Sequence, residues 1–324
     1  MSRFSILLAC AIAGCGAKTP AVATAPAKPP AMPGPYRNRL EAAVLLNARC
    51  VSCHSAEASE WSDSLHHRAH DNAPFQAAFA LEPTSFCRGC HAPEGIAELG
   101  VGCVSCHVTD GKVLTRADLG ATGGCANCHE FGFPAARSND DASFMQTTVR
   151  EHARSSAAAN PCAGCHMPLV NGRRSHAFAE VRSPGWLKDH LQTKAEIRDG
   201  HARITLAQTT PGHAFPTGDL FRRLEVGYEL RDATGKVTQR EVRHLGRRFE
   251  HVPGESARRL LEDNRVFDDP KIIDLPINGP AGSLEWWVTY QRVAQIGSGV
   301  DEANATIESE VRLSGGMLPW EAKR

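Results

Sequence analysis

The sequence of 324 residues lacks several features that usually point to a function. It has no cysteine after Cys165, only 3 tyrosines and 5 methionines, and a formal net charge of zero. Because the charges balance, no excess of basic residues favours nucleic acid as a partner. Beyond a short N-terminal stretch, no apolar run approaches the roughly 18 residues of a membrane-spanning helix. In contrast, the chain has 12 cysteines and 15 histidines, and because no cysteine follows Cys165, the chemistry of the cysteines is expected in the N-terminal half.

The N-terminus has the pattern of a targeting segment. Arg3 precedes an apolar stretch from residue 4 to 13, which predicts a signal peptide over residues 1–14. The stretch Ile12-Ala13-Gly14-Cys15 resembles the lipobox of bacterial lipoproteins, which implies cleavage before Cys15 and a lipid on its sulfur. An ordinary secretory peptide is the alternative. Residues 15–35 are rich in proline and alanine and predict an extended tether, able to hold the folded part up to about 60 Å from a membrane.

The remaining ten cysteines form five Cys-x-x-Cys pairs, and a histidine follows each pair directly. The cysteine pairs are Cys50/Cys53, Cys87/Cys90, Cys103/Cys106, Cys125/Cys128 and Cys162/Cys165. The histidines are His54, His91, His107, His129 and His166. We number these motifs one to five in chain order.

Three chemistries use a Cys-x-x-Cys pair. Zinc sites take two pairs, or one pair with distant histidines, and give no reason for a histidine at the same offset five times. A thioredoxin-like redox site needs one pair on a βαβ unit, which the pattern does not show. Covalent haem c attachment explains both cysteines and the histidine, because two thioethers hold the porphyrin and the histidine is the proximal iron ligand. The sequence therefore predicts five covalently attached haem c groups.

This cofactor content predicts the fold class, a multidomain α+β chain. With so many haems in so short a segment, residues 36–180 are expected to form a pentahaem domain of short helices and loops wrapped around the cofactors. From about residue 200 apolar residues recur at every second position, which is typical of half-buried strands. Residues 181–324 are therefore expected to form a β-rich domain resembling an antiparallel β-sandwich. The clearest strand is followed by a turn at Asp232–Gly235, which predicts a hairpin, and its alternating residues are Leu224, Val226, Tyr228 and Leu230.

Ten histidines remain after the five proximal ones, which is more than the five needed for a second histidine on every iron. Bis-histidine ligation generally gives lower reduction potentials than histidine–methionine ligation. Residues 56–69 are expected to form a helix, with His66 and His70 on one face and His67 on another. Ordinary surface or core histidines are the alternative, but beside five irons we interpret His66 and His70 as candidate distal ligands.

Several segments resemble multihaem cytochromes related to the tetrahaem cytochromes of the hydroxylamine oxidoreductase group. The resemblance covers roughly residues 45–180 and rests on Trp61-x-x-Ser64-x-His66, on residues 90–107 and on residues 162–168. It implies that His66 and His176 are distal ligands. His152, ten residues before the fifth motif, is a further candidate, at a position where relatives often have tryptophan. The loop at residues 211–219 resembles one in the C-terminal region of such cytochromes and offers His213, with a solvated surface histidine as the alternative. Five motifs instead of four are a departure from the family pattern.

Two functions fit these features. The favoured one is a membrane-anchored electron carrier that exchanges electrons with other redox proteins of the cell envelope. It would lie on the periplasmic side of a bacterial membrane, with the outer membrane favoured by Gly16 after the lipidated cysteine. The alternative is a multihaem oxidoreductase for a small nitrogen or sulfur oxyanion, or a hydroxylamine-type substrate, at a haem with an open position. Enzymes of the nitrite-reductase type often have lysine in place of one motif histidine, and those of the hydroxylamine-oxidising type use a tyrosine cross-link. Here all five motifs end in histidine and no tyrosine lies between residues 50 and 166, so neither signature is present.

Overall fold

The structure is a computed structural model of the chain. It describes residues 42–81, 83–109, 112–114, 119, 124–133, 140–178, 183–251, 258–295 and 305–321. All of these belong to one compact unit, residues 32–324. The predicted signal peptide, Cys15 and the tether lie outside the described residues. No helix within the described ranges has the length and apolar character needed to cross a membrane.

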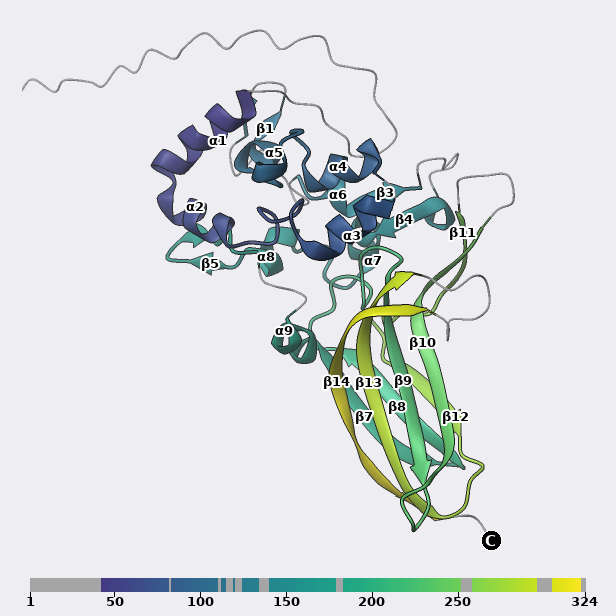
Figure 1. The fold of residues 1–324 in the computed structure, drawn as a ribbon. Coiled ribbons are helices and arrows are strands. Elements are labelled where there is room, and N and C mark those ends of the chain that lie inside the picture. Colours follow the sequence, from purple (N-terminus) through teal and green to yellow (C-terminus); the bar gives the residue numbers. More distant parts are fainter. Residues whose placement is uncertain are drawn as a thin grey trace, which may run out of the picture. The chain divides into compact units, whose positions relative to one another are not determined.

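Short helices dominate residues 42–178, which we call the helical segment (Figure 1). Its α-helices are α1 (Ala42–Cys53), α2 (Ser55–Ser62), α3 (Ala73–Leu81), α4 (Ser85–His91), α5 (Cys103–His107), α6 (Ala126–His129), α7 (Thr148–Arg154) and α8 (Cys162–His166). Two 3₁₀ turns, η1 (Ala97–Leu99) and η2 (Asp141–Ser143), lie between them. Three two-stranded ribbons complete the segment: β1 (Val108–Thr109) with β2 (Lys112–Val113), β3 (Glu130–Gly132) with β4 (Phe144–Thr147), and β5 (Leu169–Val170) with β6 (Arg173–Arg174).

The predicted helix over residues 56–69 is wrong in its second half. Helix α2 ends at Ser62, because Ser64 Oγ donates to the Trp61 carbonyl and accepts from the His67 N–H, in competition with the helical ladder. The His66 carbonyl instead accepts a hydrogen bond from the Val101 N–H at 2.8 Å. This close approach requires Gly100, where a Cβ atom would lie 2.0 Å from the His67 carbonyl oxygen. His66 and His70 therefore do not share a helical face.

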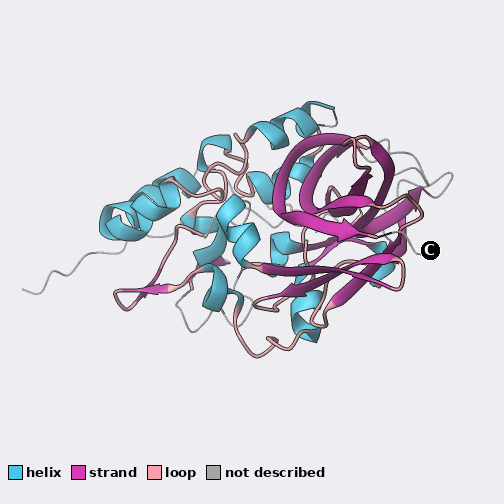
Figure 2. Cartoon of the chain, turned by 90° about the horizontal axis from the view of Figure 1, so that it is seen from below, coloured by secondary structure: helices cyan, strands magenta, loops and turns pink. Residues whose placement is uncertain are grey.

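Residues 183–321, which we call the strand segment, begin with helix α9 (Pro184–Asp189) and continue as two antiparallel sheets. The five-stranded sheet has the order β11 (Arg258–Asp263), β10 (Val237–His251), β9 (Arg222–Arg231), β13 (Gly282–Gln295) and β14 (Thr306–Trp320). The three-stranded sheet has the order β12 (Lys271–Pro276), β8 (His201–Gln208) and β7 (Leu191–Arg198). Figure 2 shows these strands in two layers.

Both sheets contribute side chains to the same apolar core, which fixes them face to face. Strand β9 supplies Leu224, Val226, Tyr228 and Leu230, all with no exposed surface, as the alternation of the sequence predicts. The predicted hairpin is confirmed, because β9 pairs antiparallel with β10 across the turn at Asp232–Gly235. Ile204 and Leu206 of β8 and Leu275 of β12 close the core from the opposite sheet.

Candidate cofactor-binding site

Each of the five cysteine motifs lies in a turn of helix. The third and fifth motifs are the whole of α5 and α8, the second ends α4, and the fourth is α6 with Cys125 directly before it. The first motif ends α1, with His54 one residue beyond the helix. Residues i, i+3 and i+4 lie on one face of a helix, so both sulfurs and the imidazole of a motif point to the same side. All ten cysteines are free thiols in the structure.

The motifs contact one another in a definite pattern. The Cys103 N–H donates to Asn47 Oδ1 of α1 at 2.8 Å, which ties the third motif to the helix that carries the first. Gly124, beside the fourth motif, neighbours Cys106, because a Cβ atom there would lie at an ordinary contact distance of 3.6 Å from the Cys106 Cα. The Cys90 thiol lies 3.9 Å from the Cys128 carbonyl oxygen.

The Cys125 thiol forms a hydrogen bond with Cys162, and this bond is the main cause of the raised pKa of Cys125. The fourth motif therefore contacts the second, the third and the fifth.

Three motif histidines face a second histidine from elsewhere in the chain. The ring centroids are 6.3 Å apart for His66 and His129, 6.1 Å for His107 and His176, and 6.1 Å for His166 and His213. Two imidazoles on opposite sides of one metal ion, each with a metal–nitrogen bond of about 2 Å, have ring centroids about 6.2 Å apart. The three pairs thus have the spacing that axial ligation of one iron requires.

Hydrogen bonds at Nδ1 orient several of these rings. His176 Nδ1 lies 3.0 Å from the Arg174 carbonyl oxygen, and His213 Nδ1 lies 3.1 Å from that of Ala214. The proximal His91 is anchored in the same way, with its Nδ1 2.7 Å from the Ala69 carbonyl oxygen. A carbonyl partner keeps the proton on Nδ1 and leaves the lone pair of Nε2 free to bind a metal.

The surroundings of the paired rings set their protonation state. His129 is exposed, yet the surrounding protein atoms are dense enough that burial lowers its pKa to about 3. Both observations hold if the ring sits deep in the protein but faces a hollow. Burial likewise lowers the pKa of His66 to about 4 and that of His166 to about 4. All three rings are therefore neutral near pH 7, the state in which histidine binds a metal.

A carboxylate holds the segment that carries His176. Glu60 of α2 accepts from Arg173 Nη1 and Nη2, both at 2.7 Å, and also accepts the backbone N–H of His176 at 2.8 Å. The hydrogen bond from Arg173 lowers the pKa of Glu60 to about 2. The bidentate pair fixes the β5–β6 ribbon against α2 and places the His176 backbone.

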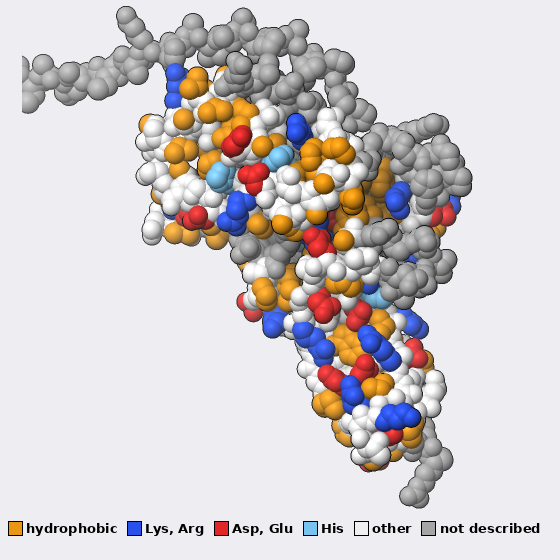
Figure 3. All heavy atoms as spheres, viewed as in Figure 1, with side chains coloured by type: hydrophobic (Ala, Val, Ile, Leu, Met, Phe, Trp, Pro, Cys, Tyr) orange, Lys and Arg blue, Asp and Glu red, His pale blue; other side chains and the backbone are white. Residues whose placement is uncertain are grey.

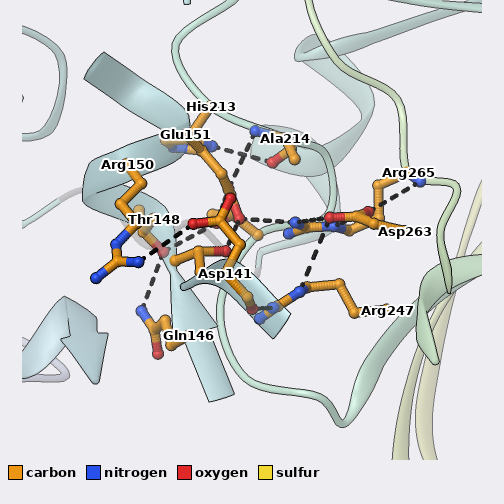
Figure 4. A network of polar contacts seen from close by, with 12 residues as sticks. Asp141, Gln146, Thr148, Arg150, Glu151, His213, Ala214, Arg247, Asp263 and Arg265 are labelled. Carbon is orange, nitrogen blue, oxygen red and sulfur yellow. Dashed lines mark hydrogen bonds and ion pairs between the residues drawn. The ribbon is translucent and has the colours of Figure 1, made fainter. Parts of the chain in front are cut away.

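A second carboxylate, Glu151 of α7, holds the loop that carries His213 (Figure 4). Its Oε2 accepts the Ala214 N–H at 3.2 Å and the Thr217 hydroxyl at 2.7 Å. Its Oε1 accepts the Thr147 hydroxyl and Arg265 Nη2, each at 2.7 Å. Arg265 is paired in turn with Asp263, so the charge of each buried group is compensated.

The other predicted residues are placed differently. His70 Nδ1 lies 3.1 Å from Asp71 Oδ1, and its ring packs 5.5 Å from Phe75, which stacks on His91. His152 lies on α7, close enough to act on the pKa of His166. Within the described side chains, neither of these histidines forms a ring pair with a motif histidine, and neither His54 nor His91 has a second histidine at the spacing found above.

Sequence reasoning missed two carboxylates and one histidine. The partners of Glu60 and, apart from Thr147, those of Glu151 lie between 63 and 116 residues away, so no local pattern indicated that these carboxylates hold distal histidines. His190 stacks on Trp186 at 4.1 Å, and Trp186 lies 6.4 Å from His166. The Trp-x-x-x-His spacing at a helix end was the available signal for His190.

No group of three or more His, Cys, Asp or Glu side chains within the described ranges is arranged to hold a bare metal ion. A haem iron takes four ligands from the porphyrin, so the protein supplies at most two axial ones. Pairs of histidines are therefore the pattern that matters.

Comparison with known proteins supports the fold. No protein-family model matches the chain, and no curated protein matches its sequence. Among solved structures, a penta-haem cytochrome c552 from Thermochromatium tepidum superposes with a TM-score of 0.60 over 87% of this chain and 99% of that one, at 16% identity. The chain therefore has the fold of a multihaem c-type cytochrome.

Two further solved structures match over 40% of the chain. They are the putative ApaA protein from Bordetella pertussis, at 11% identity with a TM-score of 0.18, and the structural-genomics target SoR45, at 12% identity with a TM-score of 0.16. The matches cover 89% and 82% of those chains. Superpositions this poor do not bear on the fold.

Proposed function

We propose that this protein is a pentahaem c-type cytochrome that transfers electrons. The observation that carries the proposal is the combination of five helical Cys-x-x-Cys-His motifs with three second histidines at the spacing of axial iron ligands. When bound, haem c supplies reversible one-electron transfer at the iron. The chain's own residues would anchor, orient and shield it.

The described residues fit such a cofactor. The ten motif cysteines would form the thioethers, and the five motif histidines would be the proximal ligands. We assign His66 opposite His129, His176 opposite His107, and His213 opposite His166. The His129 ring is exposed although dense protein surrounds it, and a porphyrin would cover it. The buried Nε of Arg222 has no hydrogen-bond partner, and a haem propionate would supply one.

The contacts between motifs support a branched order of haems. The first motif neighbours the third, the third neighbours the fourth, and the fourth also contacts the second and fifth. We infer that the fourth-motif haem, between His129 and His66, is the junction of the network. The first motif, with Cys53 and His54 exposed, would hold a haem that redox partners can reach.

We further propose that the protein is a lipoprotein of the cell envelope. The lipobox-like stretch at Cys15 and the proline-rich residues 15–35 support a lipid anchor and a tether on the periplasmic side of a membrane, with the outer membrane favoured. Its partners would be other redox proteins of the envelope. We extend the proposal to a kinship with the tetrahaem cytochromes of the hydroxylamine oxidoreductase group, on the motifs at Trp61–His66 and residues 162–168.

One observation favours the alternative, an oxidoreductase that acts at a haem with an open position. His54 and His91 have no second histidine at ligand spacing among the described residues, so the first and second haems are the candidates for such a position. Small oxyanions and hydroxylamine-type molecules are the substrate class that a multihaem site of this kind would take.

Intact mass and electron paramagnetic resonance of the oxidised protein test the proposal together. A mass increase of five haems with low-spin ferric signals is the expected result. A high-spin ferric signal from the first or second haem would favour the oxidoreductase over the carrier. If the protein is exported by a bacterium that attaches haem c to its exported cytochromes and still carries no covalent haem, both proposed functions are wrong.

A further inference from the structure

The loop at residues 211–219 leaves the strand segment and brings His213 to the fifth motif. On one side its backbone is bound to Val266, because the Phe215 N–H donates to the Val266 carbonyl at 2.7 Å and the Val266 N–H donates back at 3.1 Å. On the other side the loop meets α7, where the Thr148 and Thr217 hydroxyls lie 2.9 Å apart. The position of His213 therefore depends on how well this second side is held.

Glu151 is the centre of that side. Its side chain is 3% exposed and accepts four hydrogen bonds, two at each oxygen. Two of the donors belong to the loop and flank the turn after His213, namely Ala214 and Thr217. Because a buried carboxylate must be fully paired, the loop has one strongly favoured position relative to α7.

A single residue links this carboxylate to the imidazole. The Ala214 N–H donates to Glu151 Oε2, and the Ala214 carbonyl lies 3.1 Å from His213 Nδ1. The orientation of the His213 ring thus depends, through the N–H and carbonyl groups of Ala214, on a carboxylate 63 residues before Ala214.

We propose that Glu151 is a positioning residue that holds His213 at ligand distance opposite His166. The inference rests on the proposed function, since it needs a haem at the fifth motif. With Glu151 in this role, ligation of the fifth-motif haem by His213 depends on docking of the strand segment against α7. Glu60 has the equivalent position for His176 at the third motif, so the two carboxylates hold different distal ligands.

The variant Glu151→Gln separates positioning from folding. Glutamine keeps the shape of the side chain but retains one acceptor oxygen for four donors, so part of the hydrogen bonding that holds the loop is lost. Arg265 stays paired with Asp263, at 2.8 Å from Nε to Oδ1 and 2.6 Å from Nη2 to Oδ2, and so its charge is not left alone. The loop also keeps its bonds to Val266.

The experiment uses the full-length haem-loaded protein and four variants: Glu151→Gln, His213→Ala, the double variant, and Glu60→Gln as a matched control. The readouts are carbon monoxide bound per chain in the reduced state and the high-spin ferric signal in the oxidised state. His213→Ala should expose about one additional carbon monoxide site per chain relative to wild type, since it removes one axial ligand. Glu151→Gln should expose part of the same site.

Two outcomes support the inference together. The double variant should bind no more carbon monoxide than His213→Ala, because both changes act on one haem. Glu60→Gln should bind part of one carbon monoxide equivalent more than wild type, and a fifth variant, Glu60→Gln combined with His213→Ala, should add this amount in full to that of His213→Ala, because the two changes act on different haems.

Three outcomes overturn the inference. Wild-type spectra and carbon monoxide binding for Glu151→Gln would do so, and so would a double variant that exposes one site more than His213→Ala alone. If His213→Ala itself changes nothing while the mass still shows five haems, the assignment of His213 and with it the role of Glu151 are wrong, but the pentahaem function stands.

Discussion

The helical segment and the strand segment bury their apolar residues in different ways. Among the described residues, the main core comprises 21 buried side chains, and all of them lie between Leu187 and Trp320. The helical segment contributes none, and its large apolar side chains include Leu45 at 68% and Leu81 at 86% exposure. On the face shown in Figure 3, apolar side chains appear at many points over the helices, whereas acidic and basic side chains intermingle over the strands.

This difference indicates which part of the chain can fold without a cofactor. The strand segment satisfies the usual requirement of an apolar core made from its own residues. The helical segment has short helices of 4 to 12 residues, which are marginal without tertiary packing. Bound porphyrins would supply the apolar core that the helical segment does not build from its own side chains, as the proposed function requires.

The largest expected effect is on the haem-free chain. When the full-length protein is produced without haem attachment, amides of residues 42–178 should exchange with solvent nearly as fast as in an unfolded chain. Amides in the central strands β9 and β13 should stay protected by at least about a thousandfold, because their core needs no cofactor. Hydrogen–deuterium exchange with mass spectrometry measures both regions in one sample.

The haem-loaded protein is the control, and it should show protection in both segments. Equal protection of the two segments in the haem-free chain would show that the helical segment has a core of its own, and would remove the basis of the comparison.

A smaller effect separates the two segments residue by residue. Leu224→Ala should lower the free energy of unfolding by about 2–5 kcal/mol, because the side chain has no exposed surface and its removal leaves a cavity in the shared core. Leu81→Ala, at an 86% exposed position on α3, should change it by about 0.5 kcal/mol or less. Urea unfolding followed by circular dichroism measures both. A larger loss for Leu81→Ala than for Leu224→Ala would mean that exposure in the helical segment hides a real contact, such as one with a porphyrin.

The two segments also differ in how far the sequence predicts them. The β9–β10 hairpin was predictable, since alternation of Leu224 to Leu230 and the turn at Asp232–Gly235 are local signals that decide the structure. The five cysteine motifs were equally visible, because their chemistry needs a fixed local spacing. In both cases the information lies within a few residues.

The remaining features depend on contacts between distant residues. The helix predicted over residues 56–69 stops at Ser62 because Ser64 and the chain around Gly100 compete for its hydrogen bonds, and Gly100 lies more than thirty residues away. The pairing of His66 with His129 depends on tertiary placement in the same way. Composition indicated that spare histidines exist, but only the fold shows which motif each one faces.

The smallest expected effect concerns Glu60, the carboxylate that holds the His176 backbone in the helical segment. The pKa of Glu60 is lowered from 4.5 to about 2, mainly by the hydrogen bond from Arg173. Because the folded state binds this proton less tightly than the unfolded state, the ionised carboxylate stabilises the fold above about pH 4.5, and this contribution is lost as the pH falls toward 2. Glu60→Gln should therefore cost about 1 kcal/mol at neutral pH, a modest value because the pair is partly exposed to solvent. The cost should shrink as the pH falls below 4.5.

Unfolding free energies of variant and wild type, measured between pH 7 and about pH 2, test this prediction. The control is Glu98→Gln, which changes an exposed carboxyl of η1. A difference that stays constant across this range would show that the ionised form of Glu60 does not hold the His176 ribbon in place.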